Sequence, residues 1–159
     1  MSPKSLLRHP AVVSTEEDFT KGRFQEVIDD PNVKAKDVKR ILFCSGKVYY
    51  DLAEEQTKGK HKDVAIVRIE QLYPFPYQKV DKVLEQYSNH TEVAWVQDEP
   101  FNAGAWGFIL RALYDHHIDV MKVKVVARQE SSSPAVGYMK TFKESQTELM
   151  QEAFAPFKK

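Results

Sequence analysis

Short apolar segments alternate along this chain with longer segments in which apolar side chains recur every three or four residues. The short segments are rich in β-branched and aromatic residues, and three of them are nearly continuous in apolar character. Strands of this kind are usually covered on both faces, as in a parallel sheet. We therefore predict four buried strands, at Arg40 to Ser45, Asp63 to Glu70, Glu92 to Gln97 and Lys122 to Arg128.

The longer segments follow the strands and carry the spacing of amphipathic helices. Strands that alternate with helices imply right-handed βαβ crossovers, so the pattern predicts an α/β domain with three layers, helix, sheet and helix. The apolar faces of the helices are formed by Val48, Leu52 and Ala53; by Val80, Val83, Leu84 and Tyr87; by Ala105, Ile109, Ala112 and Leu113; and, in a last helix from about Lys140 to Phe154, by Phe142, Leu149, Met150 and Ala153.

Two segments near the N-terminus leave the pattern open. Met1 to about Pro10 contains two prolines among mixed polar residues, which predicts an arm or a linker that joins this domain to another part of a protein. Phe24 to Ile28 is closed by Asp29-Asp30-Pro31 and is too short for a free helix. It could form a helical turn or an edge strand, and periodicity does not decide between them.

Composition narrows the functions that fit such a domain. The chain has 159 residues, 42% apolar and 29% charged, with 23 Lys and Arg against 23 Asp and Glu. This balance argues against a nucleic-acid partner, which needs an uncompensated basic surface. The longest purely apolar runs are four residues, too short to cross a membrane. A single cysteine excludes an internal disulfide, and without an apolar signal region the expected compartment is reducing and intracellular.

Chemistry in an open parallel sheet is expected beyond the carboxyl ends of the strands, at a switch point in strand order. Ser45-Gly46-Lys47 leads from a strand into a helix. The free N–H groups of that turn, the Ser45 hydroxyl and the Lys47 ammonium could hold a phosphate or a carboxylate. The segment lacks the further glycine and the Ser or Thr of a P-loop. The alternative is a plain strand-to-helix turn with a surface lysine.

Gln97 to Trp106 brings amide and carboxylate groups and a large indole together after another strand. A carboxylate of this segment, Asp98 or Glu99, could act as a general base in a small stand-alone α/β enzyme. The alternative is that Asn102 caps the following helix, the acids are solvated and Trp106 packs against a neighbouring domain.

The remaining residues suggest no complete catalytic set and no metal site. Cys44 lies inside an apolar strand and is predicted to be a core side chain, because nothing near it would stabilise a thiolate. The histidines have no partner at the spacing of metal ligands or of a nucleophile and are predicted to lie at the surface: His9, His61, His90, His116 and His117.

Several longer strings of the sequence carry a specific resemblance. They occur in order across nearly all of the chain: LLRHPAVVS (6–14), CSGKVYYDL (44–52), VAIVRIEQLYPFP (64–76), WVQDEPFNAGAW (95–106) and SPAVGYM (133–139). Each string is long and compositionally unusual. Together they resemble the C-terminal domain of the thiamine-diphosphate-dependent 2-oxoglutarate dehydrogenases, the first, decarboxylating component of the 2-oxoglutarate dehydrogenase complex.

The resemblance implies a transketolase C-terminal-like fold: a mixed, mostly parallel five-stranded sheet with strand order 1-3-2-4-5 and an antiparallel edge strand. Phe24 to Ile28 would be that edge strand. The turn after Ser45 and the loop after Gln97 would then flank the switch point. Residues 1–14 would be a linker arm from the preceding domain, and residues 15–159 would be the domain itself.

For the intact protein the resemblance implies an oxidoreductase of the tricarboxylic acid cycle, in the bacterial cytoplasm or, in a eukaryote, the mitochondrial matrix. It would decarboxylate 2-oxoglutarate on thiamine diphosphate and transfer the succinyl unit to a lipoyl group of the succinyltransferase component. Thiamine diphosphate and Mg²⁺ would be bound by preceding domains, because the motif that begins Gly-Asp-Gly is absent from residues 1–159. An isolated fragment would be inactive. A related 2-oxoadipate dehydrogenase is the alternative.

For this domain the resemblance implies a supporting role: a wider homodimer interface, bracing of the preceding domains, and a part in allosteric control. An acetyl-CoA activator binds at this region in some bacterial relatives, so a regulatory nucleotide-binding module is an alternative hypothesis. A basic pocket at a helix N-terminus would suit the phosphates of CoA. The residues expected at such a site are Arg8, Ser45, Lys47, Arg68 and Gln97, and those expected at a domain or dimer interface are Glu99, Asn102 and Trp106.

Overall fold

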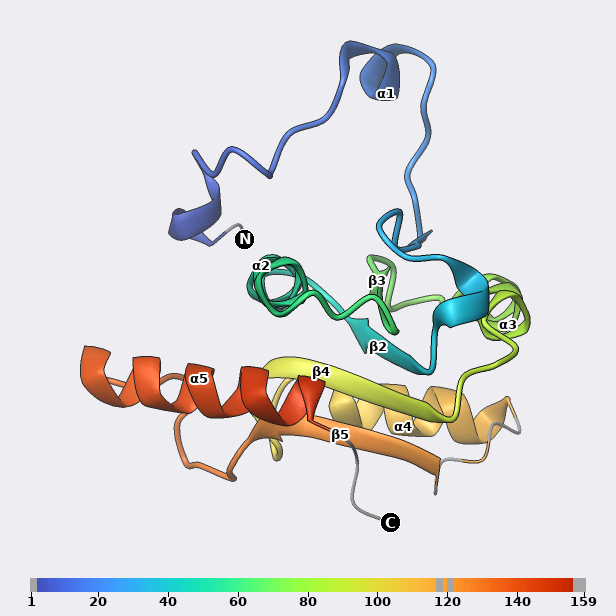
Figure 1. The fold of residues 1–159 in the computed structure, drawn as a ribbon. Helices are drawn as coiled ribbons and strands as arrows, with labels where there is room; N and C mark the ends of the chain where they lie inside the picture. Colours follow the sequence, from blue (N-terminus) through green and yellow to red (C-terminus); the bar gives the residue numbers. More distant parts are fainter. Residues whose placement is uncertain (1–2, 117–118, 120–121, 156–159) are drawn as a thin grey trace.

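Five strands form one mixed sheet in the computed structural model, which describes residues 3–116, 119 and 122–155. β1 runs antiparallel to β3, and the other neighbouring strands are parallel. The expected sheet, its strand order and its antiparallel edge strand are confirmed. The strands are β1 (Val27–Ile28), β2 (Arg40–Cys44), β3 (Val64–Ile69), β4 (Glu92–Pro100) and β5 (Val123–Arg128), in the spatial order β1-β3-β2-β4-β5 (Figure 1).

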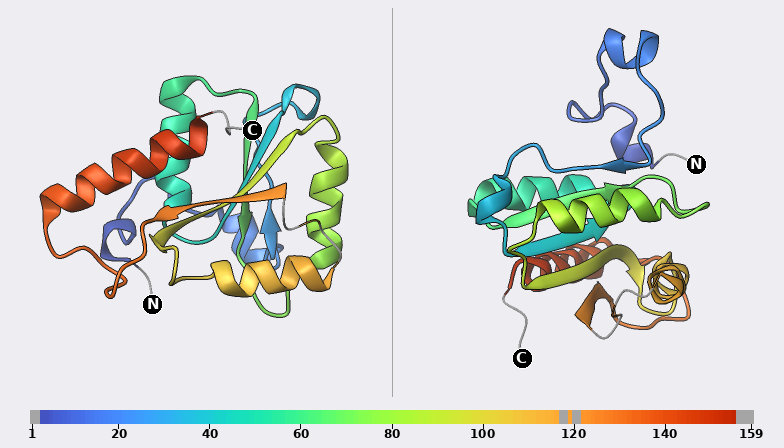
Figure 2. Two further views of the ribbon diagram at one scale, coloured as in Figure 1. Left: turned by 90° about the horizontal axis from the view of Figure 1, so that it is seen from below. Right: turned by 90° about the vertical axis from the view of Figure 1, so that its right-hand side faces the viewer.

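Two pairs of helices cover the two faces of the sheet, and each pair closes a core of its own (Figure 2). α2 (Val48–Gly59) and α5 (Met139–Phe154) pack on one face, and α3 (Tyr77–Gln86) and α4 (Trp106–Asp115) pack on the other. The apolar stripes predicted from the sequence supply buried side chains of all four helices. The three-layer α/β domain is confirmed. None of the described helices is long and apolar enough to span a membrane.

β4 is longer than the sequence predicts. It was expected to end at Gln97, but it continues to Pro100, where it pairs with Arg128 of β5. The register between β4 and β5 shifts between Val96 and Pro100. Such an irregularity turns side chains away from their regular alternation. Gln97 and Asp98 therefore stand at a bend of the strand, at the carboxyl edge of the sheet.

The outer border of β3 is only partly covered by β1, which pairs with its last two residues. Two buried side chains continue the pairing. Asp30 Oδ2 accepts hydrogen bonds from the backbone N–H of Ile66 (2.9 Å) and from Gln56 Nε2 (2.6 Å). Gln56 Nε2 also donates to the backbone carbonyl of Val64, at 2.8 Å. A carboxylate and an amide thus occupy backbone groups that a longer β1 would have satisfied.

The N-terminal arm, residues 3–20, reaches the edge of the sheet at Pro3 and stands away from the sheet around residues 16–20 (Figure 1). It contains a short 3₁₀-helix (Lys4–Leu6) and the helix α1 (Glu16–Thr20), which apolar periodicity does not predict. A capping box holds α1, because Thr15 and Asp18 each accept a hydrogen bond from the backbone N–H of the other. Large apolar side chains of the arm are exposed, among them Leu7 and Phe19.

The histidines differ in their surroundings. His9 is exposed on the arm, and its ring centroid lies 5.7 Å from that of Tyr50 in α2. His116 is partly buried at the end of α4, and its Nε2 lies 2.8 Å from Asp81 Oδ2 of α3. His117 lies outside the described residues.

A second 3₁₀-helix (Ala35–Asp37) precedes β2.

Candidate functional site

A cavity of about 690 Å³ lies at the carboxyl edge of the sheet, at the ends of β2 and β4. We call it the switch-point cavity, because β2 and β4 are neighbours whose following helices, α2 and α4, lie on opposite faces. Three of the expected ligand residues, Ser45, Lys47 and Gln97, line it, as does Glu99. Its apolar walls include Leu72, Tyr73, Trp95 and Phe108.

Lys47 follows a turn in which Gly46 has a φ of 73°, a conformation that glycine adopts at little cost. The Lys47 ammonium lies 2.7 Å from Asp98 Oδ2 and 3.3 Å from Asp51 Oδ2. Burial disfavours the ammonium, but the hydrogen bond and charge of Asp98, followed by those of Asp51, outweigh burial and raise the pKa of Lys47. The positive charge expected to attract an anion is therefore neutralised by carboxylates of the same chain.

Gln97 is 3% exposed, and its amide organises the loop that follows β4. Its Oε1 accepts hydrogen bonds from the indole N–H of Trp95 and the backbone N–H of Trp106, both at 3.0 Å. Its Nε2 donates to the carbonyls of Pro100 (3.0 Å) and Ala103 (2.7 Å). Both ends of the amide are thus engaged in holding the loop and the start of α4.

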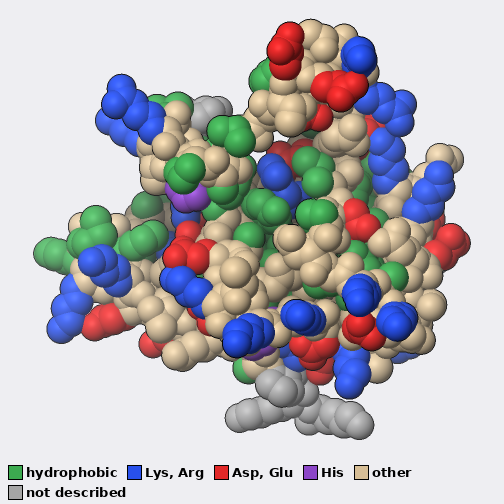
Figure 3. Space-filling model, turned by 45° about the horizontal axis from the view of Figure 1, so that its top comes forward, with side chains coloured by type: hydrophobic (Ala, Val, Ile, Leu, Met, Phe, Trp, Pro, Cys, Tyr) green, Lys and Arg blue, Asp and Glu red, His purple; other side chains and the backbone are tan. Residues whose placement is uncertain are grey.

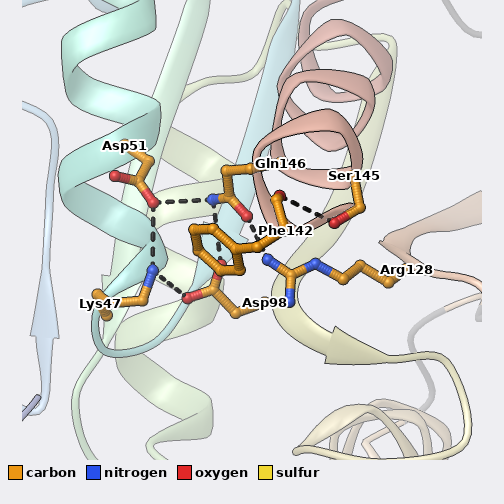
Figure 4. Close-up of polar contacts among 7 residues, drawn as sticks. All are labelled: Lys47, Asp51, Asp98, Arg128, Phe142, Ser145 and Gln146. Atoms are coloured by element: carbon orange, nitrogen blue, oxygen red, sulfur yellow. Dashed lines mark hydrogen bonds and ion pairs between the residues drawn. The ribbon is translucent and has the colours of Figure 1, made fainter. Parts of the chain in front are cut away.

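Gln146 of α5 connects side chains from three other elements (Figure 4). Its Nε2 donates to Asp51 Oδ2 (2.8 Å) and to Asp98 Oδ1 (3.2 Å). Its Oε1 accepts a hydrogen bond from Arg128 Nη2, at 2.5 Å. With Lys47 these residues bring two positive and two negative charges together. We call Lys47, Asp51, Asp98, Arg128 and Gln146 the polar network.

Part of the polar network was predictable from the sequence. Asp98 and Arg128 follow or end strands, where chemistry was expected, but Asp51 and Gln146 were not singled out. A signal existed in α5, since Gln146 lies one turn after Phe142 on the face that is otherwise apolar. The Arg128 guanidinium lies 4.8 Å from the centroid of the Phe142 ring. Its buried Nε has no hydrogen-bond partner among the described residues.

The two arginines expected at an anion site lie elsewhere. Arg68 stacks on the ring of Tyr49, 4.4 Å from its centroid, and its Nε bonds to Glu70 at 2.9 Å. Burial raises the pKa of Tyr49, although the nearby Arg68 opposes that shift. Arg8 is exposed on the arm. Neither arginine lines the switch-point cavity.

The three residues expected at an interface differ in exposure. Glu99 is exposed at the cavity, whereas Trp106 is 8% exposed and packs in the core beneath α4. Asn102 is exposed and exchanges hydrogen bonds with the backbone of Ser131, at 3.0 and 3.1 Å. The alternative that Asn102 caps α4 is wrong, because α4 has no side-chain cap at Ala105 and Asn102 bonds to another loop.

The surroundings of Asp98 and Cys44 favour a structural role for these side chains over a catalytic one. Asp98, one of the two acids considered as a base, is bound to Lys47. Cys44 is buried in β2, and burial raises the pKa of its thiol, which therefore keeps its proton. In residues 3–116, 119 and 122–155, no group of three His, Cys, Asp or Glu side chains is arranged to hold a metal ion.

Known proteins that are similar to this chain are named as components of 2-oxoacid dehydrogenases. Residues 13–154 match the family described as 2-oxoglutarate dehydrogenase C-terminal. The 2-oxoglutarate dehydrogenase E1 component of Haemophilus influenzae is 47% identical over 98% of this chain, and that of Cupriavidus necator is 45% identical over 99%. A probable 2-oxoadipate dehydrogenase complex component E1 homolog of Dictyostelium discoideum is 40% identical over 96%. The chain spans 17% of the length of each of these relatives. With residues 13–154 matched, the chain belongs to the 2-oxoglutarate dehydrogenase C-terminal family.

Proposed function

We propose that this chain is the C-terminal domain of a 2-oxoglutarate dehydrogenase E1 component. The intact enzyme decarboxylates 2-oxoglutarate with thiamine diphosphate and transfers the succinyl unit to a lipoyl group of the succinyltransferase component. One observation carries the proposal: the match covers 98% of this chain but 17% of a relative named as the E1 component. The catalytic groups of such an enzyme would then lie in other domains.

The described residues do not fit thiamine diphosphate and Mg²⁺. A diphosphate needs donors and positive charge, but Lys47 is bound to Asp98 and Asp51, and Glu99 adds a further negative charge at the cavity. Among the described residues no carboxylate cluster is arranged for a metal ion. The cofactor would therefore be bound by the preceding domains.

The role of this domain is to brace the preceding domains and to widen the homodimer interface. The exposed apolar side chains of the arm support this role, because such side chains are stabilised by cover from another surface. Glu99, near the end of β4, and Asn102, in the turn that follows it, are both exposed. Trp106, the first residue of α4, would contribute indirectly, because its buried side chain anchors α4 to the core.

The test compares the full-length protein with a version that ends before residue 13 of this chain. We expect thiamine-diphosphate-dependent release of CO₂ from 2-oxoglutarate by the full-length protein, and loss of both this activity and the dimer, measured by light scattering, in the truncated version. The isolated chain should release no CO₂. Turnover by the isolated chain, or an active dimer without it, would contradict the proposal.

A second substrate has a specific observation in its favour, the 40% identity to a probable 2-oxoadipate dehydrogenase component homolog. The two substrates differ by one methylene group, for which a binding pocket discriminates by about 1–3 kcal/mol. The ratio of kcat/KM for 2-oxoglutarate and 2-oxoadipate, measured on the full-length protein, separates the two candidates.

A regulatory ligand such as acetyl-CoA is the other candidate, supported by the convergence of Ser45, Lys47 and Gln97 on one cavity. A phosphate at this place must compete with Asp98 for Lys47. Calorimetry of the full-length protein with acetyl-CoA and with AMP tests the candidate. Heat of binding that disappears in a Lys47→Met variant supports it, and a folded protein that gives no heat at millimolar ligand removes it.

A further inference from the structure

An apolar rim borders the switch-point cavity. Tyr73, in the loop between β3 and α3, is 84% exposed, and Phe108, in the first turn of α4, is 40% exposed. Leu72 is partly buried in the same wall. We call Leu72, Tyr73 and Phe108 the apolar rim. Exposed apolar side chains that gather around a cavity mark an interaction surface.

The polar groups of the cavity disfavour a small charged ligand but permit a protein surface. Lys47 is bound to Asp98, and the amide of Gln97 is bound within its own loop. A charged ligand would have to break one of these contacts. An apolar side chain from another surface would instead cover Tyr73 and Phe108 and leave the polar network intact.

The position of the arm indicates which part of the protein could cover the apolar rim. Pro3 lines the same cavity, so the arm brings the incoming polypeptide to the rim. Figure 3 also shows hydrophobic side chains exposed at the surface between the two raised parts of the arm, the one that begins at Pro3 and the one that contains α1. A domain tethered at this point has a high effective concentration for the rim, which a partner in solution lacks. We propose that the apolar rim docks onto the domain that precedes this chain in the same polypeptide, an inference that rests on the proposed function.

Thiol labelling of the full-length, dimeric enzyme tests the proposal. Tyr73→Cys is compared with Tyr138→Cys, which is a matched control because Tyr138 is 80% exposed and does not line the cavity. Each maleimide rate is divided by the rate for the same variant unfolded in urea, and peptides are identified by mass. Docking should slow labelling at position 73 by about tenfold or more relative to position 138. Equal rates would overturn the proposal.

A second substitution identifies the rim itself as the cause of protection. Added to Tyr73→Cys, Phe108→Asp places a charge in the rim and should restore labelling at position 73. Phe101→Asp is the matched control, because Phe101 is 47% exposed and lies outside the cavity lining. Restoration by both substitutions, or by neither, would overturn the assignment to the rim.

A photo-crosslinker identifies the occupant. With p-benzoylphenylalanine at position 73, docking within one polypeptide gives a crosslinked product at the mass of one subunit, with the attached peptide upstream of this chain. A product at twice the subunit mass would mean that the partner subunit covers the rim and would overturn the proposal. The proposed function fails separately, if the full-length protein has no thiamine-diphosphate-dependent activity. Protection and the intrachain product would then still identify the docked domain.

Discussion

The polar network and the apolar rim lie at the same edge of the sheet, yet the side chains of the first are bonded to one another within the chain and most side chains of the second are exposed. Asp98 of β4 binds both Lys47, at the start of α2, and Gln146 of α5, whereas Tyr73 and Phe108 are exposed to solvent. Charged and amide groups at a strand edge are commonly taken as signs of catalysis. Here they hold the edge together, and two large apolar side chains beside them, Tyr73 and Phe108, are exposed.

The largest effect should come from Gln97, because its buried amide makes hydrogen bonds with five partners. Gln97→Ala leaves the indole N–H of Trp95 and the first N–H of α4 without their acceptor. We expect the free energy of unfolding to fall by about 3 kcal/mol. Urea denaturation of the chain measures it, with Gln129→Ala, an exposed glutamine at the same edge, as the control. A loss no larger than that of the control would contradict the structural role.

Asp98→Ala should have the next largest effect. It removes the ion pair with Lys47 and a hydrogen bond from Gln146. Since both charges of the pair are largely buried, the expected loss is about 2 kcal/mol. Glu99→Ala, one residue along the strand but exposed, should stay within about 0.5 kcal/mol. Equal losses for these two variants would mean that the network contributes nothing of its own.

The penalty of Asp98→Ala should also depend on pH. The pKa of Lys47 is raised above its ordinary value of 10.5, so its contribution to stability is fully present below that pH and is lost as the pH rises through the folded-state pKa. The difference between the parent chain and Asp98→Ala should therefore shrink in alkaline solution. Urea midpoints of both proteins, measured below and above pH 10.5, follow the change. A constant difference would contradict the sign of the shift.

The smallest effect should come from the rim. Because Tyr73 is 84% exposed, Tyr73→Ala removes little buried surface, and the free energy of unfolding of the isolated chain should change by less than about 0.5 kcal/mol. The same denaturation experiment measures it. A loss as large as that of Asp98→Ala would mean that the rim stabilises this domain itself, and the contrast between the two regions would disappear.

Much of the fold could be predicted because the same signals repeat. β2 to β5 are apolar runs, and the four long helices carry continuous stripes. α1 could not be found in this way, since its capping box stabilises a helix that buries none of its residues. The extension of β4 to Pro100 depends on pairing with β5, which is a tertiary contact rather than a local preference.

The residues of the candidate site were predictable from the positions of the strand ends, but the directions in which their side chains point were not. Ser45 and Lys47 follow β2, and Gln97 lies near the end of the neighbouring parallel strand β4, so the three residues converge on one cavity. Arg68 also lies near a strand end, but side chains alternate along β3, and Arg68 faces the same side as Ile66, towards α2. Whether a charge is already paired, as in Lys47, also depends on tertiary contacts.

The side chains of Asp30 and Gln56 have a consequence for the behaviour of this chain in solution. Uncovered main-chain groups at the margin of a sheet are a template on which strands of other molecules add, and this is a route to fibrils. At Val64 and Ile66 that template is occupied by a carboxylate and an amide, which cannot pass the pairing on to another molecule. Resistance to self-association along β3 therefore rests on two side chains rather than on a longer strand.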